Sequence, residues 1–109
     1  MIKNLPPIPP ELKSAFLAYL QEIEETLEIL SKKNSTKNFF FAENERKEFQ
    51  QRFHRLKGSS GFFKFKELIE LAHQGEVLFE KLPTAEDLSD YQAIFLSINN
   101  HLESLKTIP

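Results

Sequence analysis

The residues best suited to chemistry lie in one short segment, 53–61, with the sequence Phe-His-Arg-Leu-Lys-Gly-Ser-Ser-Gly. In a helix, where successive residues turn by roughly 100°, His54 shares a face with three other residues of this segment: Lys57, Gly58 and Gly61. The opposite face carries Phe49, Phe53, Leu56 and Ser60. We therefore expect His54 to project into solvent, beside a strip that Gly58 and Gly61 leave without bulky side chains.

An exposed imidazole of this kind is suited to nucleophilic chemistry. A neutral ring nitrogen can attack a phosphoryl group near physiological pH. Lys57, one turn along, can balance the charge of an attached phosphoryl group. Each glycine within a helix lowers its stability by about 1 kcal/mol relative to alanine. The close approach of a partner is one reason for glycines to occur there despite this cost. The ordinary interpretation is that a lone exposed histidine is simply part of the surface, and the pattern by itself favours that interpretation.

The same face continues toward the N-terminus through Lys47, Gln50 and Gln51. We expect Gln50, Gln51 and Gly61 to contribute to a docking surface around His54. Basic residues are also concentrated near the histidine, and a local basic zone can attract an acidic partner or a phosphate. They are Arg52, Arg55, Lys57, Lys64 and Lys66. For each of them singly, a solvated helical surface is the simpler interpretation.

Hydrophobic periodicity predicts four helices that position this segment, over about 11–32, 43–62, 65–82 and 85–106. Thr84 is a plausible cap for the last helix, with Asp87 three residues on. No sustained alternation or hairpin turn predicts a strand. The expected fold is all-α, an antiparallel up-down four-helix bundle. His101, on the last helix, is assigned to the flank of the core or the surface, and Gly75 is expected to permit close helix packing.

The segments outside the helices have simple interpretations. Residues 1–10 contain four prolines and are expected to form an extended arm, so that 11–109 make up the single bundle domain. Residues 31–38 form a polar loop. Phe39, Phe40 and Phe41 follow it, and we expect them to plug one end of the core and to staple the start of the next helix.

Composition excludes several classes of function. The 109 residues suffice for one domain with one core. The absence of cysteine excludes disulfides and thiolate metal sites, and three histidines without a tight acidic cluster make a poor metal site, so none is expected. No apolar run approaches a membrane span, and no signal peptide is evident. The net charge of −2 does not suggest nucleic-acid binding. A cytoplasmic location is expected.

The pattern His54-x-x-Lys57-Gly58, followed by Gly61, resembles the signature of histidine phosphotransfer domains. The stretch 69–76, Ile-Glu-Leu-Ala-His-Gln-Gly-Glu, looks like the third helix of the N-terminal domain of the chemotaxis kinase CheA. The resemblance covers roughly residues 11–105. It implies that His54 is the phosphoacceptor. It also implies that His73 and Glu76 form a hydrogen-bonded network with His54, in which Glu76 orients His73 and His73 holds His54 in one tautomer. The helical pattern alone does not show that His73 faces His54, and an exposed histidine with an ordinary neighbouring glutamate is the simpler alternative.

One position departs from the family. Relatives usually carry a further glycine three residues after Gly61, where this chain has Lys64. A glycine there lets the helix end in a left-handed conformation. Either Lys64 adopts the left-handed conformation, which strains a residue with a Cβ, or the turn takes another shape.

The resemblance implies a phosphocarrier rather than an independent enzyme. A histidine kinase would phosphorylate His54, and the receiver domain of a response regulator would take the phosphoryl group onto an aspartate. The domain itself is expected to bind no cofactor, since Mg²⁺ and ATP belong to the receiver and the kinase. It is expected to be monomeric in isolation. Two variants stay open, the excised first domain of a CheA-like kinase and a free-standing relay protein. The alternative from another class is a helical module that binds a receiver or another partner without being phosphorylated.

Overall fold

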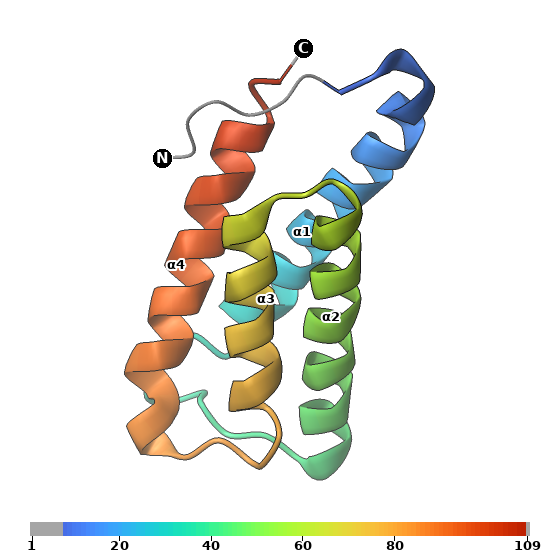
Figure 1. Ribbon diagram of the computed structural model, residues 1–109. Helices are drawn as coiled ribbons and strands as arrows, with labels where there is room; N and C mark the ends of the chain where they lie inside the picture. Colours follow the sequence, from blue (N-terminus) through green and yellow to red (C-terminus); the bar gives the residue numbers. More distant parts are fainter. Residues whose placement is uncertain (1–7, 109) are drawn as a thin grey trace.

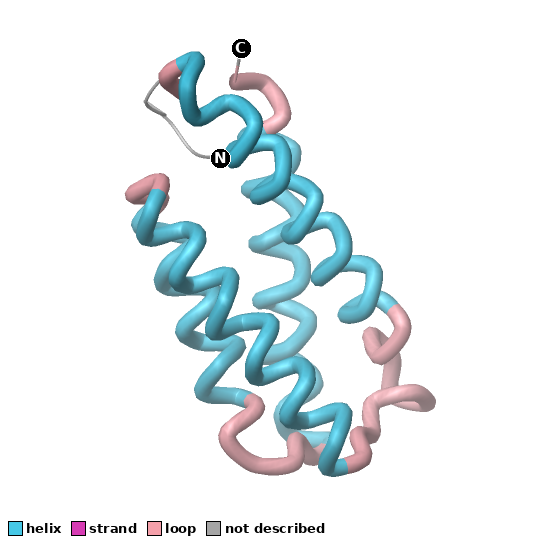
Figure 2. Tube along the Cα trace, turned by 90° about the vertical axis from the view of Figure 1, so that its right-hand side faces the viewer, coloured by secondary structure: helices cyan, strands magenta, loops and turns pink. Residues whose placement is uncertain are grey.

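The computed structural model describes residues 8–108 and is helical, with no strand in that range (Figure 2). The elements are η1 (Pro10–Leu12), α1 (Lys13–Ser31), α2 (Glu43–Phe62), α3 (Lys66–Leu78), η2 (Ala85–Asp87) and α4 (Leu88–Leu105). Successive α-helices run in opposite directions, and α3 lies between α2 and α4 (Figure 1). The expected antiparallel four-helix bundle is confirmed. Residues 1–7 of the expected proline-rich arm lie outside the described range.

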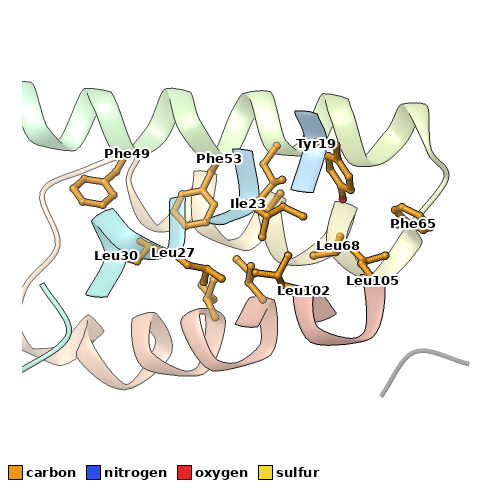
Figure 3. Close-up of a cluster of buried hydrophobic side chains, with 14 of the residues drawn as sticks. Tyr19, Ile23, Leu27, Leu30, Phe49, Phe53, Phe65, Leu68, Leu102 and Leu105 are labelled. Carbon is orange, nitrogen blue, oxygen red and sulfur yellow. The ribbon is translucent and has the colours of Figure 1, made fainter. Parts of the chain in front are cut away.

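The core runs along the bundle axis and receives side chains from all four helices. The inward-facing side chains of α1 are Tyr19, Ile23, Leu27 and Leu30. They face Phe49 and Phe53 of α2, Leu68 of α3, and Leu102 and Leu105 of α4 (Figure 3). Their spacing of three and four residues places them on one face of each helix, which is why the amphipathic pattern produces a bundle. Buried hydroxyl groups find hydrogen-bond partners within this core. Tyr19 shares a hydrogen bond of 2.7 Å with Ser60, and Tyr91 donates to the carbonyl oxygen of Leu30.

The second helix begins and ends at the predicted residues, but α3 ends at Leu78 instead of about Leu82. Proline has no N–H, so Pro83 cannot bond the carbonyl oxygen of Phe79 as a continuing helix would require, and its ring would clash there. Arg46 of α2 replaces the missing donor, with Nη1 2.7 Å from the Phe79 oxygen. Leu82, the last residue of the predicted helix, lies beyond the end of α3 and is 46% exposed. The proline affects the helix four residues before its own position.

The other boundaries differ by small amounts. The predicted first helix opens as the 3₁₀ turn η1 before α1, and the predicted last helix opens as η2 before α4. The expected cap at Thr84 is present, because its backbone N–H donates to Asp87 Oδ2 at 2.8 Å. The start of α2 has the same arrangement, in which the Ala42 N–H donates to Glu45 Oε1.

The expected plug of three phenylalanines is formed by only two of them. Phe39 is buried against Tyr91, and Phe41 contacts the rings of Phe49 and Phe79. Phe40 is 68% exposed, so its inclusion in the plug was wrong. Its neighbours on both sides turn inward, and in a non-helical segment a middle residue between two inward-facing ones points outward.

Residues 8–108 contain no helix with the length and apolar character needed to cross a membrane.

Candidate functional site

The site is built on α2 and completed by α3, the two helices that pack most closely (Figure 1). His54 lies near the middle of α2, on the face away from the core, and its side chain is 68% exposed. Phe53, the residue before it, is buried, as are Phe49 and Leu56. The predicted exposure of His54 is therefore confirmed, because three neighbours on the opposite face anchor the helix in the core.

Glu76 of α3 reaches across to both predicted residues of α2. Its Oε2 lies 2.7 Å from His54 Nδ1, and its Oε1 lies 2.5 Å from Lys57 Nζ. The ammonium of Lys57, which donates a hydrogen bond to this carboxyl, and the His54 ring hold the pKa of Glu76 below its usual range against a weaker opposing effect of burial. Glu76 is therefore a carboxylate at neutral pH and bridges the two residues.

The contact with Glu76 determines the tautomer of His54. A carboxylate can only accept hydrogen bonds, so Nδ1 must carry the proton that it donates to Oε2. In the neutral ring the lone pair is then on Nε2, the nitrogen away from Glu76. The geometry leaves the lone pair of this nitrogen free, and the carboxylate can stabilise positive charge on the ring when that lone pair attacks an electrophile.

The structure does not place His73 between Glu76 and His54. Glu76 contacts His54 directly, and no hydrogen bond to the His73 side chain occurs among residues 8–108. His73 is exposed and lines a groove between α3 and α4, together with Val77 and Ile94. Residues three apart on a helix point roughly 60° apart, and the rotation of α3 directs Glu76 toward α2.

Both glycines of the signature leave the surface beside His54 open. A Cβ built on Gly58 or on Gly61 would meet no atom within 4 Å in the described part of the chain, apart from its own helix. The strip predicted from the helical pattern is therefore present. Gly75 is the opposite case, because a Cβ there would overlap the Phe53 ring, and the expectation that Gly75 permits close packing is confirmed.

The turn after α2 shows how this chain accommodates Lys64. Its φ is 62°, the left-handed conformation that glycine adopts most easily. The Phe65 N–H bonds to the Ser60 oxygen, and the Lys64 N–H bonds to the Gly61 oxygen. This is the hydrogen-bond pattern of a Schellman motif, in which the left-handed residue follows the cap. Lys64 accepts the strain and keeps the turn.

A shallow hollow of about 320 Å³ adjoins His54. It is lined by Gln50, Gln51, His54, Arg55 and Glu76. Both glutamines lie on the predicted face of His54 and line the hollow beside its ring. Arg46, which donates to the side chain of Gln50, is a residue that the sequence pattern did not single out. The spacing of Glu43, Arg46 and Gln50 on one helix was the available signal.

His101 lies outside this site, on α4. Its ring contacts the Ser97 carbonyl oxygen and Glu67, at 2.7 and 2.9 Å, so it joins α4 to α3 at the flank of the core as expected. In residues 8–108, no three histidine or acidic side chains come together in a group that could hold a metal ion.

Comparison with known proteins bears on the whole bundle. The family model described as the Hpt domain matches residues 12–108, which is nearly all of the chain and includes every site residue discussed above. No curated protein and no solved structure matches the chain significantly.

Proposed function

The chain belongs to the Hpt domain family, whose members are histidine phosphotransfer modules of phosphorelay signalling, and from this we propose that His54 is its phosphoacceptor. Hpt domains carry a phosphoryl group and interact with kinases and with the receiver domains of response regulators. The observation that carries the proposal is the contact of Glu76 with His54 Nδ1 at 2.7 Å, which leaves Nε2 free and exposed.

The proposed first step is attack on a phosphorus atom. The Nε2 lone pair forms an N–P bond while the bond from phosphorus to the leaving oxygen of ATP, held by the kinase, breaks. The ring becomes more positive as this bond forms, and the Glu76 carboxylate stabilises that charge through Nδ1–H. The negative charges of Glu76 and of the attached phosphoryl group repel each other. The ammonium of Lys57, 2.5 Å from the Glu76 carboxylate, reduces this repulsion.

The proposed second step reverses the chemistry at His54. An aspartate oxygen of the receiver attacks phosphorus, the N–P bond breaks, and its electron pair returns to Nε2. Catalytic groups, nucleotide and Mg²⁺ belong to the partner proteins in this proposal, and the domain supplies a positioned imidazole. The open strip at Gly58 and Gly61 lets the receiver approach. A cytoplasmic location and a monomeric state belong to the same proposal.

The likeness to the CheA domain in particular is a further prediction, together with a role in chemotaxis. Glu76 supports it in part, because its carboxylate contacts His54, although directly and not through His73 as that resemblance implied. His73 does not support it, because it lies in the groove toward α4. A free-standing relay protein is the other variant, and identification of the kinase that phosphorylates the chain distinguishes the two.

The test is phosphorylation by a histidine kinase with radiolabelled ATP. We expect a label that is lost in acid and stable in base, as a phosphoramidate of histidine should be. His54→Gln should abolish it, whereas His73→Gln and His101→Gln, the matched controls, should retain it. Label that persists in His54→Gln defeats the assignment of the site. An unlabelled wild-type chain that still binds a receiver would favour the non-phosphorylated interaction module.

A further inference from the structure

The hollow beside His54 has a composition that suits one particular ligand. Its lining residues include Gln50, Gln51 and Arg55, whose side chains end in amide and guanidinium groups. These groups present hydrogen-bond donors, and an attached phosphoryl group presents only acceptor oxygens and negative charge. We infer that this hollow holds the phosphoryl oxygens on His54, with the Gln50 amide as a fixed donor and Arg46 as its positioning residue. The inference rests on the proposed function.

Helix geometry places His54 next to this hollow. Side chains of a helix lean toward its N-terminus, so the imidazole lies over the preceding turn, which carries Gln50 and Gln51. Toward the C-terminus, one and two turns on, Gly58 and Gly61 offer no side chain. Apart from Lys57, which donates to Glu76, the donors of α2 that line the hollow with His54 include Gln50 and Gln51 of the preceding turn.

Arg46 determines which way the amide of Gln50 points. Its Nη1 donates to Gln50 Oε1 at 3.2 Å and to the Phe79 carbonyl oxygen at 2.7 Å. Arginine has donors only, so the oxygen of the amide faces Arg46 and the NH₂ group is directed away from it. Arg46 is itself fixed by two hydrogen bonds to the carboxylate of Glu43. In residues 8–108 no acceptor is bonded to Gln50 Nε2, which leaves both of its hydrogens available for a ligand.

Electrostatics favours the same side of the ring. Glu76 holds Nδ1, and its negative charge repels phosphoryl oxygens attached to Nε2. Lys57 already donates a hydrogen bond to Glu76, so its positive charge offsets the negative charge of that carboxylate. Oxygens that turn away from Glu76 meet Gln50, Gln51 and Arg55 in the rest of the hollow. A donor that is fixed before the reaction stabilises the charged product without a cost of reorganisation.

The experiment uses phosphoramidate, a small phosphodonor that needs neither kinase nor receiver. In this reaction the phosphorus–nitrogen bond of the reagent breaks, ammonia leaves, and the N–P bond to His54 forms. The rate of labelling, the rate of hydrolysis of the phosphohistidine and its ³¹P chemical shift are measured on the full chain. Gln50→Leu removes the donor, and Arg46→Leu removes its positioning residue. Arg46→Lys restores a donor to the Gln50 oxygen, and Gln74→Leu is the matched control on α3.

Gln50→Leu should slow labelling or speed hydrolysis by about tenfold, the effect of one hydrogen bond to a charged group, and should shift the ³¹P resonance. Arg46→Leu should act in the same direction, Arg46→Lys should recover part of the effect, and Gln74→Leu should match the wild type. If Arg46→Leu does not fold, Gln50→Leu decides the question alone. A labelled wild type with unchanged rates and shift in Gln50→Leu overturns the inference. An unlabelled wild type overturns the proposed function instead.

Discussion

The ring of Phe53 occupies the space in which a side chain of residue 75 would lie. A Cβ on Gly75 would overlap Phe53 Cδ1, so that one of the two groups would have to shift. Each of these residues directly precedes a member of the site, Phe53 before His54 and Gly75 before Glu76. The missing side chain therefore lets α2 and α3 approach at the one level where Glu76 must reach His54.

Substitution of Gly75 by alanine should destabilise the domain. The added methyl group must displace a fully buried ring, and overpacking of this kind costs about 1–3 kcal/mol, more than the roughly 1 kcal/mol that alanine gains in helix propensity. Urea unfolding of both proteins measures the difference. Gly58→Ala is the matched control, since nothing lies within 4 Å of its Cβ, and it should be more stable than the wild type by about 0.5–1 kcal/mol. Equal behaviour of the two variants would contradict the packing argument.

Replacement of Lys64 by glycine should stabilise the domain. The left-handed conformation at φ 62° costs a residue with a Cβ about 1 kcal/mol, and glycine removes that cost. Thermal or urea unfolding should show a gain of that order for Lys64→Gly. Lys64→Ala keeps the Cβ and should show no such gain, which separates backbone strain from any effect of the lysine charge. A gain of the same size in Lys64→Ala would show that strain is not the cause.

The interaction of Glu76 with its partners should make stability depend on pH in the acid range. Its folded-state pKa is lowered, chiefly by the hydrogen bond from Lys57, so the folded state favours the carboxylate. The stabilisation is present above the unfolded-state pKa of a glutamate, about 4.3, and is lost as the pH falls through the lower folded-state value. Unfolding of the wild type and of Glu76→Gln should therefore differ at pH 6 and converge toward pH 3. A difference that stays constant over this range would argue against the ionic contact.

A bulky residue at Gly61 should separate phosphorylation from transfer. A Cβ at this position meets no other atom of residues 8–108 within 4 Å outside its own helix, so the domain should still fold with leucine, which fills the strip by which we propose that a receiver approaches. Gly61→Leu should label normally with phosphoramidate and pass the phosphoryl group to a receiver at least tenfold more slowly. Gly61→Ala, the smaller control, should transfer at a rate close to that of the wild type. Normal transfer by Gly61→Leu would remove Gly61 from the docking surface.

The local features of this protein follow from the order of its residues. The helical period alone indicates that His54 is exposed, because Phe53 and Leu56 must face the core and residues of one helix keep fixed angles to one another. The same reasoning finds the bounds of α2 and the cap at Thr84. It fails at Leu82, where the effect of Pro83 extends back to the carbonyl oxygen of Phe79.

Local patterns do not show whether His73 or Glu76 contacts His54, and only the tertiary structure decides it. Both residues lie on the same helix, and a difference of roughly 60° in direction selects one of them. That rotation is determined by how closely Gly75 packs against Phe53, a contact between residues 22 positions apart in the chain. No local pattern encodes it, because the sequence determines which face of each helix is buried, whereas the packing of two helices determines which side chains meet across them.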